Sequence, residues 1–362
     1  MIIYLSSSLG QVAQTPTGTA QDSLECLAIA AREGNHVLLG DRGTLKRLAA
    51  ATQLSNKARA EFKRIEQQTT SMIGLVKQAV ACAVVVDPAQ PSVSDPVDAE
   101  VTIELPLSFF TTTQSIQSTT LLCENLNDGH LVQMLAESWR ARKRLSFPAK
   151  SQLVAGGGST TAHSLANLES QHRFVLTVVD SDRRFSSDGL GETASKCVEA
   201  HNKTVRNSHL LVLAQREVEN LLPLTCLATA DGGAPHAAVA LYSKAVDASH
   251  HEFVAFHDWK NGLTARKLFE IGEVCTSNFA AQAAAHCTAC IATPKCSSSA
   301  ECECTVLPGF GVQSLQRFVL HAKELTPHKL GELLAGAPLP SEIEALGRTA
   351  WSWTCGSAKR VS

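Results

Sequence analysis

Four acidic residues come in two pairs, and each pair follows a short apolar stretch. Glu124 ends the string LLCE with Asp128 four residues later, whereas Asp180 and Asp182 follow the string FVLTVV. Carboxylates that gather in one place repel one another unless a cation neutralises them. Mg²⁺ prefers such oxygen ligands and keeps waters that a substrate phosphate can displace. The two pairs therefore predict a site for Mg²⁺ or Mn²⁺ that acts on phosphodiester bonds.

An alternative remains for each acid taken alone. A single Asp in a loop after a strand is most often a turn former or a helix cap. This alternative is strongest for Asp128, because it lies where the next helix is expected to begin.

The elements that would position these acids alternate between apolar strands and amphipathic helices. Strands are expected at 120–123, 152–155, 174–179 and 209–214, with a helix from about 130 to 144. This alternation favours an α/β fold with a mostly parallel sheet flanked by helices. Ligands of such sheets bind beside the carboxyl ends of the strands, where both acidic pairs lie.

The residues before this core have the pattern of a small α/β domain. Short buried strands are expected at 2–6, 36–40, 82–87 and 101–107, with helices at 22–32 and 57–80. A linker rich in Thr, Ser and Gln follows, and beyond Pro223 the pattern is mainly helical. We therefore expect an N-terminal α/β domain of unknown role at 1–115, a catalytic core at 116–225, and a mainly helical accessory region at 226–362.

The order of these motifs resembles the Toprim fold of topoisomerases, primases and OLD-family nucleases. The resemblance rests on Glu124, the acid four residues on, the glycine-rich GGGST at 156–160 and the Asp-x-Asp. QREVENLLP at 215–223 is similar to the Arg-Glu-hydrophobic-Glu-Asn helix of OLD-like prokaryotic defence nucleases. Toprim proteins usually have Gly after the catalytic Glu, whereas this chain has Asn125. Asn tolerates the left-handed backbone conformation that such a turn can require.

The resemblance implies a role for each acid. The implied metal ligands are Glu124, Asp128, Asp180, Asp182 and Glu219. Of these, Glu124, Asp180 and Asp182 are the implied catalytic residues, and Glu124 also serves as the acid/base for the phosphodiester oxygen. Glu217 is left as a surface helper or salt-bridge partner.

Three basic residues are candidates for contact with nucleic acid. Arg183 and Arg184 directly follow the Asp-x-Asp, although a solvated loop would explain them as well. Lys260 lies in FHDWK, which is similar to an Asp-x-Lys segment of some Toprim-like defence proteins where the lysine faces phosphate. An ordinary helix N-terminus is the favoured alternative for that segment.

Hydrolysis is the expected chemistry, because a topoisomerase needs a tyrosine nucleophile and neither Tyr4 nor Tyr242 lies near the acids in sequence. The resemblance implies a metal-dependent endonuclease of DNA or RNA that acts in antiviral defence. Two alternatives stay open: a Toprim enzyme of nucleic-acid maturation or primer synthesis, and a non-catalytic scaffold for a partner ATPase.

The glycines at 156–158 favour a tight turn, since the lysine of a P-loop is absent. An OLD-like system would therefore need its ATPase or sensor as a separate chain.

Composition limits the surroundings in which the protein works. A net charge of -2 gives no global attraction to nucleic acid, and an aromatic content of 5% offers few platforms for base stacking. No signal-peptide pattern begins the sequence, and no apolar run is long enough to cross a bilayer. We expect a cytoplasmic protein with no membrane partner.

Twelve cysteines fall into two groups. Seven are scattered among apolar segments and are typical of small buried side chains. The other five crowd together at Cys287, Cys290, Cys296, Cys302 and Cys304. Their C-x2-C pair predicts a structural Zn²⁺ site, with disulfides or idle thiols as the alternatives.

Overall fold

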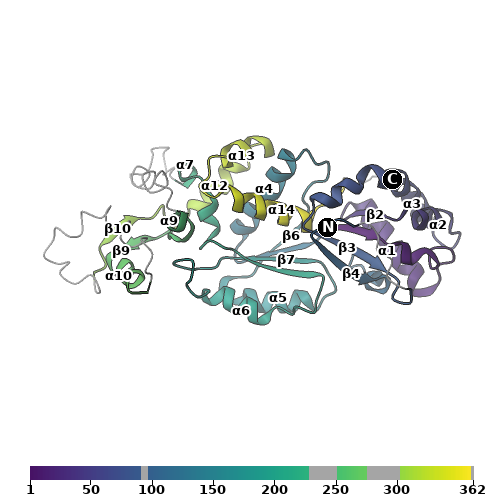
Figure 1. Cartoon of the computed structure of the whole chain (residues 1–362), viewed down its shortest axis with the longest axis horizontal. Coiled ribbons are helices and arrows are strands. Elements are labelled where there is room, and N and C mark those ends of the chain that lie inside the picture. The colour runs from purple at the N-terminus through teal and green to yellow at the C-terminus, as the bar shows by residue number, and fades with distance from the viewer. Residues whose placement is uncertain (91–96, 228–250, 275–301, 360–362) are drawn as a thin grey trace. The chain divides into compact units, whose positions relative to one another are not determined.

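The computed structural model describes residues 1–90, 97–227, 251–274 and 302–359. They belong to two compact units. The first comprises Met1–Val178, Cys197–Leu211 and Glu344–Ser362, and the second comprises Val179–Lys196 and Val212–Ile343. Figure 1 shows the described helices and strands of both units with their labels.

The first unit begins with a four-stranded parallel sheet. Its strands are β1 (Ile2–Leu5), β2 (Val37–Gly40), β3 (Ala81–Val86) and β4 (Val101–Pro106), in the order β2-β1-β3-β4. The main helices around it are α1 (Gly18–Glu33), α2 (Arg42–Ala50) and α3 (Asn56–Met72). The first three strands are almost entirely buried, which explains why they appear in the sequence as apolar runs.

One predicted helix in this part of the chain is shorter than expected. The sequence predicts a helix over 57–80, but α3 ends at Met72 and a 3-10 helix, η2 (Ile73–Gln78), follows. Gly74 lies at this junction, and glycine disfavours a helix interior because it loses more backbone entropy than other residues.

A second parallel sheet repeats the same strand order. It consists of β5 (Thr120–Cys123), β6 (Gln152–Ala155), β7 (Val175–Val179) and β8 (Ser208–Val212), in the order β6-β5-β7-β8. Each connection between successive strands contains a helix. These helices are α4 (Leu126–Arg142), α5 (Thr161–Glu169) and α6 (Glu192–Ala200). Cys123 at the end of β5 is in register with Ala155 of β6 and Val178 of β7. The predicted α/β class with parallel sheets flanked by helices is confirmed.

The C-terminal helix α14 (Pro340–Thr354) contacts residues of both sheets within the first unit. Ser352 Oγ accepts a hydrogen bond from the backbone N–H of Ala81 at 2.9 Å, at the start of β3. Thr119, just before β5, donates its hydroxyl to the carbonyl of Trp353 at 2.5 Å. The ring of Trp351 lies 5.2 Å from that of Trp139 on α4. Residues distant in sequence therefore complete this core.

The second unit contains shorter elements. These are η5 (Val218–Leu221), α7 (Leu224–Leu227), α9 (His251–Phe256), β9 (Gly262–Thr264), α10 (Ala265–Val274), β10 (Thr305–Pro308), α12 (Ser314–Ala322) and α13 (Pro327–Leu334). The antiparallel pair β9 and β10 was not predicted. The sequences GLT and TVLP of β9 and β10 show neither an alternation of polar and apolar residues nor the longer apolar run that marks the strands of the parallel sheets.

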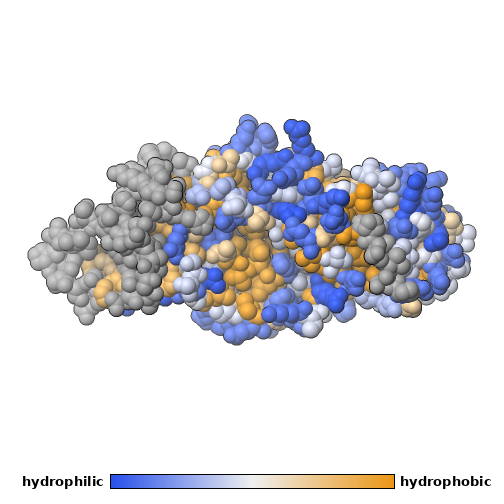
Figure 2. All heavy atoms as spheres, in the orientation of Figure 1, coloured by the Kyte–Doolittle hydropathy of each residue, from blue (hydrophilic) through white to orange (hydrophobic). Residues whose placement is uncertain are grey.

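The surface of the described chain mixes polar and apolar residues. Figure 2 shows hydrophilic side chains spread over the drawn face, with hydrophobic residues gathered in separate areas between them. Large exposed apolar side chains come from separate elements, such as Ile29 on α1, Val101 on β4 and Leu320 on α12. Scattered apolar residues of this kind are normal for protein surfaces. None of the described helices has both the length and the apolar character needed to span a membrane.

Candidate active site

The second unit begins where β7 ends, and the residues that follow this strand are tied to the segment around Arg216. Asp180 is buried, and its Oδ1 accepts a hydrogen bond from the backbone N–H of Val218 at 3.0 Å. The Ser181 hydroxyl donates to the carbonyl of Gln215 at 2.7 Å. The backbone N–H of Asp182 donates to the carbonyl of Arg216 at 3.0 Å. These bonds place the predicted Asp-x-Asp motif beside the QREVEN motif.

Asp182 has an unusual backbone conformation. Its φ is +54°, a left-handed conformation that non-glycine residues rarely adopt. Gly191 lies so close that a Cβ at this position would come within 2.4 Å of the Asp182 Cβ. A glycine at 191 thus allows the chain to hold Asp182 in this strained position.

The QREVEN motif forms a short 3-10 helix rather than the expected regular helix. Glu217 and Asn220 form a capping box around η5, in which the Glu217 N–H donates to Asn220 Oδ1 at 2.9 Å. The Asn220 amide also donates to the carbonyls of Val254 and His257 at 2.7 and 2.9 Å. Glu219 is fully buried and Glu217 is 6% exposed. The expectation of a surface helper was therefore wrong, because the capping box turns Glu217 inward, whereas the alternative of a salt-bridge partner is confirmed by its ion pairs with Arg216 and Lys260.

Lys260 lies between the two glutamates of this motif. Its Nζ is 3.2 Å from Glu219 Oε1 and 3.6 Å from Glu217 Oε2. The lysine lies in a turn between α9 and β9, in which the Gly262 N–H donates to the carbonyl of Asp258. The favoured alternative of an ordinary helix N-terminus was wrong, since β9 separates this turn from α10.

Burial and charge have opposite effects on these groups. Burial raises the pKa of Glu217, and the nearby charges of Asp258 and Asp182 raise it further, although Lys260 and Arg216 oppose the change. Burial alone would lower the pKa of Lys260, but the charges of Glu219, Glu217 and Asp180 outweigh it and raise that pKa. The positive charge of Lys260 thus interacts with the carboxylates of Glu219, Glu217 and Asp180.

The donor set of this cluster suits a hard divalent cation. Asp180, Glu217 and Glu219 offer only carboxylate oxygens, which are the ligands that Mg²⁺ and Mn²⁺ prefer. Lys260 lies beside two of these acids and Arg216 lies beside Glu217, so the acids are already in contact with positive charge. Within the described ranges, no three His, Cys, Asp or Glu side chains are grouped closely enough to hold a metal ion. The ammonium of Lys260 instead lies between two of the acids.

No family model, curated protein or solved structure matches this chain.

Glu124 follows β5 and belongs to the first unit. Its backbone carbonyl accepts a hydrogen bond from the Gly157 N–H at 2.9 Å, and its side chain is half-buried. The pKa of Cys197 is raised to about 11, mainly by burial and further by the charge of Glu124. The first unit thus fixes the backbone at Glu124, whose role as metal ligand and acid/base stays a prediction.

Asp128 takes part in a capping box at the start of α4. Asn125 is the N-cap, and its side chain accepts from the N–H groups of Asn127 and Asp128. Asp128 Oδ2 in turn accepts from the Asn125 backbone and amide nitrogens at 3.2 and 2.7 Å. The helix-cap alternative for Asp128 is therefore observed, and metal binding by this residue stays a prediction. Asn125 has an extended backbone with φ -137°, so the left-handed turn considered for it does not occur.

Replacement of Asp128 by alanine should lower stability through loss of this cap. We expect Asp128→Ala to lower the free energy of unfolding by about 1 kcal/mol, because two N–H groups at Asn125 lose their acceptor. Chemical denaturation monitored by tryptophan fluorescence would measure the change. Asp22→Ala, an acidic residue of α1 outside the capping position, is the control and should stay within about 0.5 kcal/mol of the original protein. An Asp128→Ala protein with unchanged stability would contradict the capping role.

The glycine-rich segment after β6 is a tight turn, as expected. The N–H groups of Gly156 and Gly157 donate to the carbonyls of Cys123 and Glu124 at 2.7 and 2.9 Å. Gly157 and Gly158 have positive φ angles of +79° and +64°, which side chains disfavour. Two of its backbone donors thus join β6 to the end of β5.

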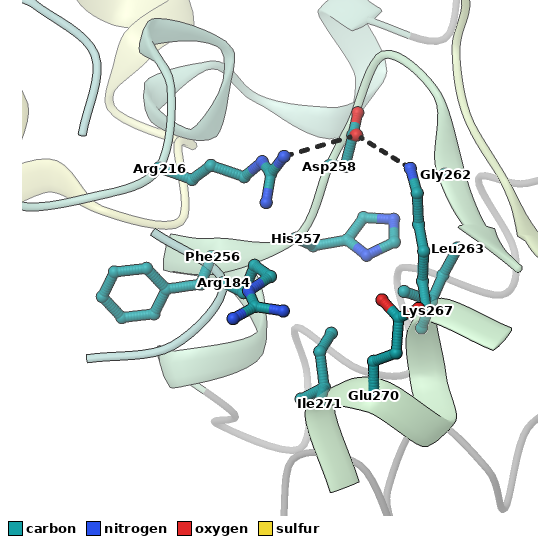
Figure 3. Close-up of a pocket in the computed structure, with 10 residues that line it drawn as sticks. All are labelled: Arg184, Arg216, Phe256, His257, Asp258, Gly262, Leu263, Lys267, Glu270 and Ile271. Carbon is teal, nitrogen blue, oxygen red and sulfur yellow. Dashed lines mark ion pairs between the residues drawn. The ribbon is translucent and has the colours of Figure 1, made fainter. Parts of the chain in front are cut away.

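Arg183 and Arg184 line different cavities of the second unit. Arg183 lines a cavity of about 480 Å³ together with Gln215 and Phe256. Arg184 donates from Nε to Asp188 Oδ2 at 2.8 Å and lines a smaller cavity with Arg216 (Figure 3). Contact of either arginine with nucleic acid stays a prediction.

The predicted zinc site cannot be assembled from the described residues alone. Cys287, Cys290 and Cys296 lie outside them. Cys302 is buried and Cys304 is exposed, and their carbonyls accept hydrogen bonds from the first two residues of α10. Structural Zn²⁺ at this cluster stays a prediction.

Proposed function

We propose that this protein is a metal-dependent endonuclease that hydrolyses phosphodiester bonds of DNA or RNA. The observation that supports this proposal is the cluster of Asp180, Glu217 and Glu219 around Lys260. Burying three carboxylates is costly, and a protein that needed only a stable core would be served better by apolar residues. Concentrations of perturbed ionisable groups are typical of functional sites.

The proposed ligands of Mg²⁺ or Mn²⁺ are the acids that the sequence singled out. In the second unit these are Asp180, Asp182 and Glu219, while Glu124 and Asp128 are the proposed ligands of the first. The bound ion would supply charge to the phosphate oxygens and activate the attacking water. Lys260, in the same cluster, would neutralise a non-bridging phosphate oxygen. Glu124 is the proposed acid/base, and it would hold the proton that the leaving oxygen needs.

Hydrolysis is proposed in preference to covalent strand passage. Tyr4 is only 4% exposed within β1, so its hydroxyl is poorly placed to attack a nucleic-acid strand. Tyr242 lies outside the described residues. A water molecule, rather than a tyrosine, is therefore the proposed nucleophile.

The wider setting follows from the resemblance to Toprim nucleases of the OLD-like type. We propose that the parallel sheet β6-β5-β7-β8 with its flanking helices is a Toprim-like core. The protein would then act as an antiviral defence effector with a separate ATPase or sensor chain.

A cleavage assay with defined metal content tests the proposal. Purified full-length protein is incubated with DNA, RNA and tRNA in Mg²⁺, Mn²⁺ or EDTA, with and without the chain encoded beside it. We expect cleavage with either metal, none in EDTA, and loss of cleavage in Asp180→Asn. Binding of Mn²⁺ measured by calorimetry should weaken in the same variant. Cleavage that persists in EDTA or in Asp180→Asn would refute the metal-dependent mechanism, and nucleotide incorporation in place of cleavage would indicate primer synthesis.

A further inference from the structure

A small cavity in the second unit is lined by basic residues. It has a volume of about 130 Å³, and its polar lining includes Arg184, Arg216, Lys267, His257, Asp258 and Glu270. Figure 3 shows these side chains around one space, with Phe256, Leu263 and Ile271 as the apolar part of the wall. Arg216 comes from the QREVEN motif, whereas Lys267 comes from α10. Elements that are distant in sequence thus bring three cations to the same cavity.

Two of these cations have hydrogen-bond donors that are not used. Arg216 Nη2 and Lys267 Nζ lie 3.6 and 3.7 Å from Asp258 Oδ2, which is close enough for ionic attraction but too far for a hydrogen bond. Asn261 already bonds this carboxylate, through its backbone N–H at 2.7 Å and its amide at 3.2 Å from each oxygen. Among the described residues, neither the Arg216 guanidinium nor the Lys267 ammonium donates any hydrogen bond.

The other polar groups of the cavity do not supply the missing acceptors. Glu270 accepts from Arg266 Nε at 3.0 Å, and Arg266 lies outside the cavity lining. Burial lowers the pKa of His257 to about 3, so its ring is neutral at physiological pH. Arg184 is bonded to Asp188 and is 43% exposed. Arg216 Nε is buried without an acceptor, which is costly, and the Lys267 ammonium adds positive charge beside it, so the site suits an anion with several acceptor oxygens.

We propose that this cavity binds a second phosphate group of the nucleic-acid substrate, next to the phosphate that is cleaved. The proposal rests on the proposed nuclease function and names a recognition site for its substrate. Arg216 and Lys267 are the donors, and Arg184 stands at a solvent-exposed part of the wall. A phosphate offers the planar guanidinium of Arg216 two oxygens at once, which suits its paired donors.

Size and position both favour a phosphate group over a whole nucleotide. Sites for drug-sized ligands usually occupy about 300–1,000 Å³, whereas this cavity measures about 130 Å³. Arg216 also connects the two sites, because its Nε lies 3.6 Å from Glu217 Oε1 in the acidic cluster. A strand that places one phosphate at the acids would therefore bring a neighbouring phosphate toward the cavity.

Binding measurements in EDTA test this site without any need for catalysis. Inorganic phosphate is titrated into full-length protein and followed by ³¹P NMR, and a fluorescent single-stranded oligonucleotide is titrated at several salt concentrations. We expect Lys267→Gln to weaken both ligands about tenfold and to reduce the salt dependence of oligonucleotide binding by about one released counterion. Lys267→Arg should keep most of the affinity, because it retains the charge and the donors.

Lys196→Gln is the matched control. Lys196 lies in the same unit, is 47% exposed against 49% for Lys267, and pairs with Glu192 outside the cavity. Its replacement should leave phosphate and oligonucleotide binding within about twofold. Equal effects of Lys267→Gln and Lys196→Gln, or no phosphate binding by the original protein, would overturn the proposal. An absence of cleavage would instead contradict the proposed nuclease function. The phosphate site and the nuclease function are therefore tested by different measurements.

Discussion

Glu219→Gln is expected to lower metal-dependent cleavage about 10³-fold, the largest catalytic effect that we predict for any single replacement. Glu219 is fully buried, and its carboxylate lies 3.2 Å from the ammonium of Lys260. Glutamine has nearly the same shape but carries no charge, so the variant removes a proposed metal ligand and leaves the packing in place. Losses of this order are typical when a charge-stabilising group is removed from an active site.

The measurement is the rate of cleavage of a labelled oligonucleotide at saturating Mn²⁺, accompanied by thermal unfolding in EDTA to show that the variant is folded. Glu324→Gln is the control, because Glu324 is an exposed glutamate of the same unit. It should cleave within about twofold of the original protein. A folded Glu219→Gln protein that retained more than a tenth of the activity would exclude Glu219 as a metal ligand.

The sheets could be predicted from the sequence because their signal is local. β5 and β6 occupy the predicted residues 120–123 and 152–155, and β7 begins one residue later than predicted. Strands of a parallel sheet are covered on both faces, so each appears as a short run of apolar residues with clear ends. The acids placed after these runs lie at strand ends for the same reason.

The partners of the acids could not be predicted in the same way. Lys260 approaches Glu219 only because a turn after α9 folds back onto η5, some 40 residues earlier in the chain. Arg216 and Lys267 also line one cavity although they are far apart in the sequence. Neither pairing has a local spacing that a sequence pattern can capture.

One signal in the sequence did point to a buried ionic cluster. The QREVEN motif lies between the apolar strings LLVLA and LLP, where charged residues are otherwise rare. Charged side chains in such surroundings are seldom fully buried unless they are paired. This context favours a buried Glu217 with basic partners, which agrees with the salt-bridge alternative for this residue and not with a surface position.

The two groups of charges in the second unit have complementary roles in the proposed mechanism. The acids around Lys260 offer carboxylate oxygens, and the cations around the small cavity offer hydrogen-bond donors. A divalent cation would bind at the first group, and a substrate phosphate would bind at the second. Arg216 contacts both groups, so the binding of substrate and of metal should reinforce each other.

Lys260→Met is expected to lower the free energy of unfolding by about 3–5 kcal/mol at pH 8, the largest effect on stability that we predict. Lys260 is the shared counter-charge of Glu217 and Glu219, which are both buried. Removing one partner of a buried ionic group leaves the remaining charges uncompensated, and this costs more than the intact group contributes. Methionine retains most of the length and apolar surface of the lysine stem, so lost packing contributes little.

The difference in the free energy of unfolding between Lys260→Met and the original protein should decrease as the pH falls. The pKa of Glu217 in the folded protein is already raised by burial, and it should rise further without Lys260. A carboxyl group whose folded-state pKa exceeds its unfolded value binds protons more readily in the fold, so the fold gains stability as the pH decreases through that range. In the original protein the pKa of Lys260 is raised, so its contribution is complete at neutral pH and is lost only in strongly alkaline solution. Unfolding by urea at pH 8 and at pH 5.5 should therefore show a larger gain of stability at the lower pH in the variant than in the original protein.

Lys267→Met separates this effect from a general loss of positive charge. Lys267 is 49% exposed and lies 3.7 Å from Asp258, so its ion pair is screened by solvent and should contribute less than about 1 kcal/mol. Its replacement should be tolerated at both pH values. If Lys260→Met were as stable as Lys267→Met at pH 8, Lys260 would not be the counter-charge of ionised Glu217 and Glu219, and the expected role of this lysine would be excluded.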